Sequence, residues 1–270
     1  MPDGFSTALA AVAKALFLVG SVYIYLSLVR QIAARRESAT EEPQRTFGFP
    51  EVVLALALAT LFTFSVANAT AQTTRVLLGS RELILNGLIS LAMFLIVAGL
   101  LKVRGLNVTA MAGFGKLGFW RTLVTGVVLL FAAYPLIVAA DALAQRVLGG
   151  TPSQQSIIEL FNESQTLQQR VLIIILAVAI APMVEEFVFR FFLYGVVKRY
   201  AGGFAGLVAN SLLFAAVHGH APSAAPLFVL GLCFTLAYEW SGSILVAMTM
   251  HALFNSLTLT ALAFPNATGQ

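Results

Sequence analysis

The sequence predicts an all-α, polytopic membrane protein of about eight transmembrane helices, with a buried polar site in its C-terminal half. Of the 270 residues, 59% are hydrophobic and only 10% are charged, and the mean hydropathy is +0.89. A soluble domain carries about a quarter charged residues, so this chain has too little polar surface to face water. Its apolar residues form continuous runs, and the alternating pattern of a membrane β-barrel does not recur.

Eight apolar runs are predicted to form the transmembrane helices, and they lie at residues 8–29, 51–70, 83–101, 120–144, 171–197, 204–221, 224–239 and 243–263. Each is near the ~20 residues that a helix needs to cross ~30 Å of hydrocarbon, although the sixth and seventh are short. We expect residues 1–150 and 151–270 to contribute about four spans each to one integrated membrane domain.

The basic residues of the connections predict the orientation of the chain. The first connection, with Arg35, and the third, with Lys102, carry four Lys or Arg residues each, whereas the second and fourth carry two each. Lys198 and Arg199 follow the fifth span within a short connection, so the first, third and fifth connections are taken as the basic ones. Such connections face the cytoplasm, so both chain ends are expected on the other side. The last connections carry no Lys or Arg, so the C-terminal half is oriented by continuity alone. Because the net charge of +4 is spread over short connections, we expect no nucleic-acid partner.

The fourth connection, residues 145–170, is polar but contains an apolar patch of Ile157, Ile158, Leu160 and Phe161. It fits a short helix lying at the membrane surface over a cavity, and it fits an ordinary capped loop helix equally well. Elsewhere, Pro182 is expected to bend the fifth helix. Glu239, at the end of a span, is expected to reach headgroup water.

The stretch VEEFVFR, residues 184–190, places three ionisable groups inside an apolar run. A charge near the bilayer centre costs ~2.5–3.5 kcal/mol on insertion scales. Glu186 and Arg190 are four residues apart on one helical face, so they are predicted to form an ion pair. Glu185 is rotated by ~100° from Glu186 and gains nothing from that pair. It therefore needs a polar cavity, a cation or another polar side chain.

Two later spans supply polar partners at helical spacing. Phe214 and His218 are four residues apart, as are His251 and Asn255. Measured from the predicted ends of their spans, Glu185, both histidines and Asn255 fall at comparable depth. The sequence therefore predicts one polar cluster midway through the bilayer.

These residue types suit the hydrolysis of an amide bond inside the membrane. A glutamate and a histidine can hold and deprotonate a water molecule, while a second histidine and an amide stabilise the oxyanion. Glu185, His218 and His251 equally suit a zinc site with a fourth position for water. Their spacing is not that of a zinc-binding HExxH helix, so zinc and a metal-free site both stay open as the cofactor choice.

The stretches EEFVFR, FAAVH and HALFN fit the patterns EExxxR, FxxxH and HxxxN in order. This triplet resembles the CPBP family, the CAAX protease and bacteriocin-processing (Abi) enzymes, over roughly residues 150–265. The resemblance implies an intramembrane endopeptidase whose catalytic helical core is residues 151–270. It also implies a membrane-embedded or lipid-anchored protein or peptide as substrate, in the lipid bilayer of a prokaryotic cytoplasmic membrane.

The resemblance implies a role for each motif residue. Glu185 activates water with help from His218, and His251 with Asn255 stabilises the oxyanion. Glu186, Arg190 and Phe214 support the structure of the site. The family is often described as metalloproteases, while a glutamate-only mechanism has been argued for its prenyl-protein members.

Two other classes of function stay open. A non-catalytic bacteriocin-immunity or scaffold protein could share the fold, although no motif residue is missing. A proton-coupled transporter could also use intramembrane Glu and His. Neither an inverted repeat nor a matched pair of broken helices favours the transporter.

Overall fold

The computed structural model describes residues 4–38, 46–71, 79–148, 161, 164 and 166–264, and these ranges contain helices and turns but no strand. The N-terminal elements are α1 (Gly4–Ser38), α2 (Phe49–Ala71), α3 (Ser80–Val103), the short α4 (Val108–Met111) and α5 (Phe119–Leu148). The C-terminal elements are α7 (Leu167–Ile175), η1 (Leu176–Ile180), α8 (Ala181–Glu186), η2 (Phe187–Leu193), α9 (Tyr194–Val217), η3 (Ala221–Ser223), α10 (Ala224–Ser241) and α11 (Ile244–Ala263). The all-α prediction is confirmed.

Seven stretches of the described chain are long and apolar enough to cross a membrane, and the longest, Leu167–Val217, has 51 residues. At 1.5 Å per residue it would be about 77 Å long, far more than one crossing requires. Gly202 breaks it with φ +84° and ψ 166°, a conformation that favours glycine. The stretch therefore supplies both the fifth and the sixth predicted spans, which confirms about eight helices.

The sixth span is shorter than predicted. The prediction ran to residue 221, but α9 ends at Val217 and His218 is its C-cap. Gly219, with φ +61°, then turns the chain into η3. From Gly202 to this end the helix covers only residues 203–217, about 22 Å. It is thus too short for a full ~30 Å crossing.

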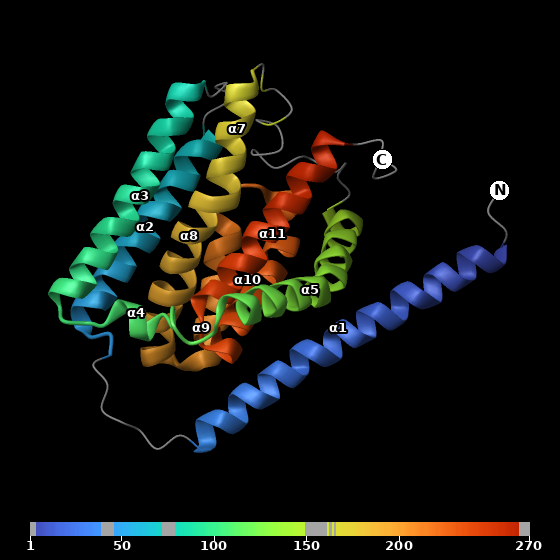
Figure 1. Cartoon of the computed structure of the whole chain (residues 1–270), viewed down its shortest axis with the longest axis horizontal. Helices are drawn as coiled ribbons and strands as arrows, with labels where there is room; N and C mark the ends of the chain where they lie inside the picture. Colours follow the sequence, from blue (N-terminus) through green and yellow to red (C-terminus); the bar gives the residue numbers. More distant parts are fainter. Residues whose placement is uncertain are drawn as a thin grey trace.

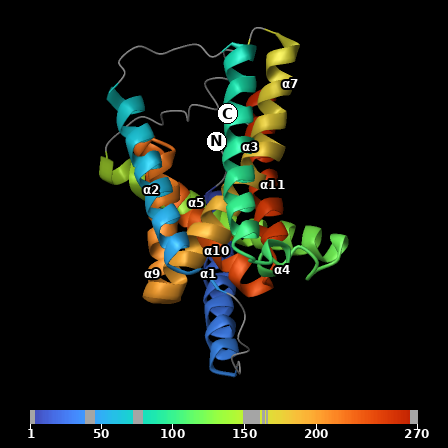
Figure 2. The same ribbon diagram turned by 90° about the vertical axis from the view of Figure 1, so that its left-hand side faces the viewer.

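The helices α8, α9, α10 and α11 form the centre of the molecule, and the N-terminal helices surround it (Figures 1 and 2). The helix α2 packs along α9, while α3 packs along α7, η1 and α8. The helix α1 crosses α5 and α10, and its N-terminal part projects away from the bundle in Figure 1. Each N-terminal helix therefore meets the centre along one side and leaves its other sides for lipid.

Small residues let the central helices approach closely. A Cβ on Gly231 of α10 would lie 3.2 Å from the Cα of Ser211 in α9. Beside it, the Asn210 side chain donates to the hydroxyl of Thr235 at 3.2 Å. Close approach through small residues and polar contacts is how membrane helices associate, since lipid supplies no hydrophobic drive between them.

At one end of the bundle the described connections are fastened to one another. We call this end the basic face, and it comprises residues 46–48, 104–118, 242–243 and the stretch from Lys198 to the break at Gly202. The Ile244 N–H donates to the Ala112 carbonyl at 2.9 Å. A guanidinium N–H of Arg35 donates to the Trp240 carbonyl at 2.7 Å. Gly113, with φ +71°, lies against Gly242 so closely that an added Cβ would be 1.9 Å from the Gly242 oxygen.

Glu239 lies at this face but does not reach freely into headgroup water, so that expectation was wrong. Its carboxylate forms an ion pair with Lys198 and accepts a hydrogen bond from the Tyr194 hydroxyl at 2.9 Å. Both partners lie at the start of α9, before the break at Gly202. A tertiary partner of this kind is invisible to a reading of α10 alone.

Most of the predicted surface helix in residues 145–170 lies outside the described residues. Phe161 is described, and it is buried in a small cluster with Leu83, Ile173 and Leu259. After it, Thr166 and Gln169 form a capping box that begins α7. We call this end of the bundle, where α3, α7 and α10 begin and α9 and α11 end, the opposite face.

Candidate active site

The two glutamates lie on a helix that is interrupted on both sides. The α-helical turn of Ala181–Glu186 stands between the π-helical segments Leu176–Ile180 and Phe187–Leu193. Pro182 has no N–H to donate, and the Ala181 N–H bonds to the Leu176 carbonyl five residues earlier. Such π segments are frequent at functional sites because they change which side chains share a face.

Glu186 and Arg190 form the ion pair that their spacing predicts. The Nε of Arg190 lies 3.1 Å from Glu186 Oε2, and both side chains are fully buried. The pair lies at the centre of the bundle, where an unpaired charge would cost several kcal/mol. The prediction of this pair is confirmed.

Aromatic rings enclose the Arg190 guanidinium on several sides. Its carbon lies 4.0 Å from the centroid of Phe214 and 5.2 Å from that of Phe234. Within the described part of the chain, its Nη atoms have no hydrogen-bond partner. Cation–π attraction therefore supports the charge where hydrogen bonds do not, and Phe214 takes part directly.

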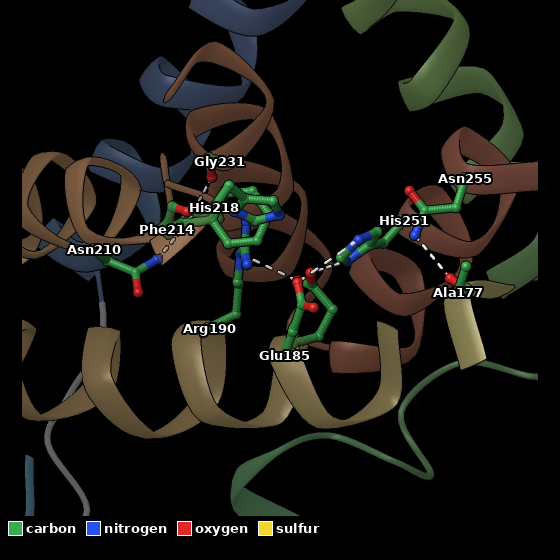
Figure 3. A network of polar contacts seen from close by, with 11 residues as sticks. Ala177, Glu185, Arg190, Asn210, Phe214, His218, Gly231, His251 and Asn255 are labelled. Atoms are coloured by element: carbon green, nitrogen blue, oxygen red, sulfur yellow. Dashed lines mark hydrogen bonds and ion pairs between the residues drawn. The ribbon is translucent and has the colours of Figure 1, made fainter. Parts of the chain in front are cut away.

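His251 joins both glutamates, as Figure 3 shows for Glu185. Its Nδ1 lies 2.7 Å from Glu186 Oε1, and its Nε2 lies 3.9 Å from Glu185 Oε2. Because an ionised carboxylate only accepts, Nδ1–H donates to Glu186 and Nε2 is the nitrogen nearer Glu185. Helical spacing predicted only Arg190 as a partner of Glu186. The bond to His251 was not predicted, because His251 is 65 residues further along the chain.

His218 and Asn255 each use one group to bond the backbone. His218 Nδ1 lies 2.7 Å from the Phe214 carbonyl, so Nδ1–H donates there and a neutral ring keeps its lone pair on Nε2. Asn255 Nδ2 donates to the Ala177 carbonyl at 2.7 Å, which ties α11 to η1 (Figure 3). One amide N–H of Asn255 remains for another acceptor.

Glu185, His218, His251 and Asn255 line a single cavity of about 310 Å³ together with Phe214. The Glu185 side chain is 30% exposed, whereas that of Glu186 is fully buried. The remaining lining is mostly apolar and includes Leu176, Ile180, Leu227, Leu230 and Phe254. A mostly apolar cavity with a few convergent polar groups is the usual form of a ligand site.

One wall of this cavity was not foreseen. Asn86, Gly87 and Ser90 of α3 line it, although residues 1–150 were expected to provide only membrane spans. The Asn86 side chain is exposed and has no hydrogen-bond partner among the described residues. A Cβ on Gly87 would lie 2.6 Å from the Leu176 side chain, so α3 packs tightly here. An amide inside an otherwise apolar span was the signal that could have found Asn86.

The acidic groups of the site meet at His251. Its Nδ1 faces Glu186 and its Nε2 faces Glu185, so one imidazole links the two carboxyl groups. Arg190 is the cation that pairs with Glu186.

Among the described residues, no three His, Cys, Asp or Glu side chains stand close enough together to hold a metal ion. Glu185, His218 and His251 share the cavity, and each imidazole uses Nδ1 in a bond to the protein and keeps Nε2 for another partner. The side chains as placed do not form the tetrahedral set that zinc requires. The proposed hydrolysis therefore uses side chains alone.

Residues 167–257 match the family model of the Rce1-like type II CAAX prenyl endopeptidases. The match contains all three motifs and supports a CAAX-type intramembrane protease that acts on a protein or peptide in a membrane. Comparison with curated proteins and with solved structures found no match.

Proposed function

We propose that the chain is an endopeptidase that cleaves a membrane-embedded or lipid-anchored protein or peptide, and the match of residues 167–257 to the Rce1-like family model supports this proposal. Its expected home is the cytoplasmic membrane of a prokaryote. One observation carries the proposal: the Glu185 carboxylate, partly exposed, lines a cavity within the membrane that two imidazoles and a carboxamide also line.

Glu185 acts as the general base. It takes a proton from a water molecule in the cavity, and the water oxygen forms a bond to the carbonyl carbon of the scissile peptide. The lone pair of His218 Nε2, left free by the bond from Nδ1 to Phe214, accepts the other water proton in a hydrogen bond and orients the molecule. Positioned proton transfer of this kind contributes typically 10²–10⁴-fold to a rate, roughly.

His251 and Asn255 stabilise the negative charge that develops on the carbonyl oxygen. In the proposed mechanism His251 carries a proton on Nε2 as well as on Nδ1, so Nε2–H and the remaining amide N–H of Asn255 are the donors to that oxygen. Preorganised donors in a site that excludes bulk water are worth more than the same donors in water. When the intermediate collapses, the C–N bond breaks, and the proton held by Glu185 passes to the departing nitrogen. The products are a carboxylic acid and an amine, and Glu185 is ionised again.

Glu186, Arg190 and Phe214 act on the reaction through His251. The carboxyl group of Glu186 holds the imidazole through Nδ1, and Arg190, packed against Phe214, pairs with that carboxyl group within the bundle. We therefore assign them a positioning role.

The test compares membranes from cells that carry the wild-type chain or the Glu185→Gln variant, by quantitative profiling of protein N-termini. Glutamine keeps the size of the side chain but cannot take the proton, so N-termini created by cleavage should disappear. Glu82→Gln, at an exposed position at the start of α3, is the matched control and should keep them. Identical profiles for the wild type and Glu185→Gln would refute the proposal and favour a non-catalytic role.

A second measurement addresses metal use. Purified protein in detergent is treated with a chelator. It is then given a synthetic peptide that spans a cleavage site identified by the N-terminal profiling. The glutamate mechanism predicts unchanged cleavage. Activity lost on chelation and restored by zinc would instead require a metal that joins Glu185, His218 and His251.

A further inference from the structure

We infer that substrates reach Glu185 from the side of the membrane away from the cytoplasm. The identity of the ligand as a peptidase substrate rests on the proposed function, but the side from which the cavity opens is a separate property of the fold. It follows from two observations: the distribution of charge over the two ends of the bundle, and the position of the cavity between them.

The two ends differ in their Lys and Arg content. Among the described residues, the connections of the basic face and the adjoining helix ends carry Arg30, Arg35, Arg36, Lys102, Arg104, Lys116, Arg121, Lys198 and Arg199. Those of the opposite face carry only Arg81, Arg146 and Arg170 within the same described ranges. An excess of Lys and Arg in short connections marks the cytoplasmic side. The basic face is therefore cytoplasmic.

The rim of the cavity lies in the other half of the bundle. Asn86 is six residues from the start of α3 and 17 from its end at the basic face, about 9 Å and about 26 Å. Leu227 follows the start of α10 by three residues, and His218 caps the far end of α9. None of the connections of the basic face lines the cavity.

The shortness of the sixth span opens this side. Since residues 203–217 cover only about 22 Å, the turn from His218 to Ser223 lies short of a full ~30 Å crossing. His218 thus stands where the helix gives way to a turn, and the cavity reaches from there to Glu185 near the middle of its own helix. Water and an extended peptide can approach along this side without crossing the bundle.

The fastened connections tie the basic face together. The Ile244–Ala112 and Arg35–Trp240 hydrogen bonds and the Gly113–Gly242 contact hold the α10–α11 turn against the third connection. The expected substrates are consequently chain segments that have already been inserted or exported, with the scissile bond in the non-cytoplasmic half of the bilayer.

Cysteine accessibility tests the side of opening without requiring catalysis. Cys233 is the sole cysteine and is 2% exposed, so the wild-type chain gives a low background. Asn86→Cys places a thiol at the cavity rim, and Lys102→Cys places one at the exposed basic face. Each variant is treated with a membrane-impermeant maleimide in right-side-out and in inverted membrane vesicles.

We expect Asn86→Cys to be labelled at least tenfold more in right-side-out vesicles, and Lys102→Cys at least tenfold more in inverted ones. The reverse pattern, equal labelling of Asn86→Cys from both sides, or its protection from both sides would each overturn the inference. If labelling follows expectation while Glu185→Gln changes no N-terminus, the opening stands and the peptidase assignment fails. If cleavage occurs but labelling is reversed, the peptidase stands and the opening fails.

Discussion

The N-terminal helices α1–α3 and the central helix α10 are similarly apolar but have different surroundings. Within their most hydrophobic 18-residue windows, 11% of α1 and 17% of α2 and of α3 is buried, against 44% of α10. Most apolar side chains of the N-terminal helices are exposed and face lipid, while the central helices enclose Glu186, Arg190 and His251. Hydropathy thus indicates that a helix lies in the membrane, whereas buried polar residues indicate that it encloses a polar site.

The largest contrast should appear between two ion pairs. Arg190→Met leaves Glu186 buried without its partner, which should cost about 3–5 kcal/mol. Arg104→Met in the N-terminal half removes the half-exposed partner of Glu51 and should cost about 1 kcal/mol or less. Thermal unfolding in detergent measures both. Equal losses of stability in the two variants would contradict the contrast between the buried and the half-exposed ion pair.

The double variant Glu186→Gln/Arg190→Met separates folding from positioning. It removes both charges, so it should regain much of the stability that Arg190→Met loses. Because His251 then lacks its carboxylate, cleavage should stay impaired. Full recovery of cleavage would contradict the positioning role of Glu186.

Two asparagines of the central helices should differ in activity. Asn255→Ala removes a donor to the oxyanion and should lower kcat by roughly 10²–10³-fold. Asn210→Ala removes an amide that bonds Thr235 away from the cavity, and it should leave kcat unchanged while costing about 1 kcal/mol of stability. A kcat loss shared equally by both variants would identify a general packing effect instead.

The rim of the cavity should respond more weakly. Asn86→Leu removes one candidate hydrogen bond to the substrate backbone, worth about 1 kcal/mol or about fivefold in kcat/KM. We expect the change in KM, because Asn86 binds substrate without touching the reacting atoms in the proposed mechanism. A main effect on kcat would place Asn86 in the chemistry.

The smallest effect is expected at a lipid-facing position on the same helix. Leu95 is 64% exposed, so Leu95→Ala should alter stability and cleavage by no more than about 0.5 kcal/mol. Unfolding and kcat/KM are measured beside Asn86→Leu. A larger loss would show that α3 has a partner on its outer side.

Local spacing was enough to predict the membrane helices and the Glu186–Arg190 pair, because a four-residue interval on one helix brings two side chains together. It could not predict contacts between helices. Glu186 also holds His251, and Glu239 pairs with Lys198, through distances in sequence that no helical period describes. The end of α9 was misplaced because the predicted span was extended through the polar His218, whereas the helix ends before it and Gly219 turns the chain.

The α3 wall escaped prediction for a related reason. Asn86 has no motif around it, and its meaning depends on the helix that packs against it. The catalytic roles of Glu185, His218, His251 and Asn255 remain proposals, which the four residues' shared cavity supports.

The close approach of Gly113 to Gly242 limits how far this protein can be shortened. His251 is seven residues, about two turns, beyond Ile244, whose N–H is held by the third connection. The height of that imidazole relative to the two glutamates is thus set by a backbone contact outside residues 167–257. A fragment limited to residues 167–257 would keep every motif residue. It would lose the third connection, whose contacts with Gly242 and Ile244 fix the position of α11.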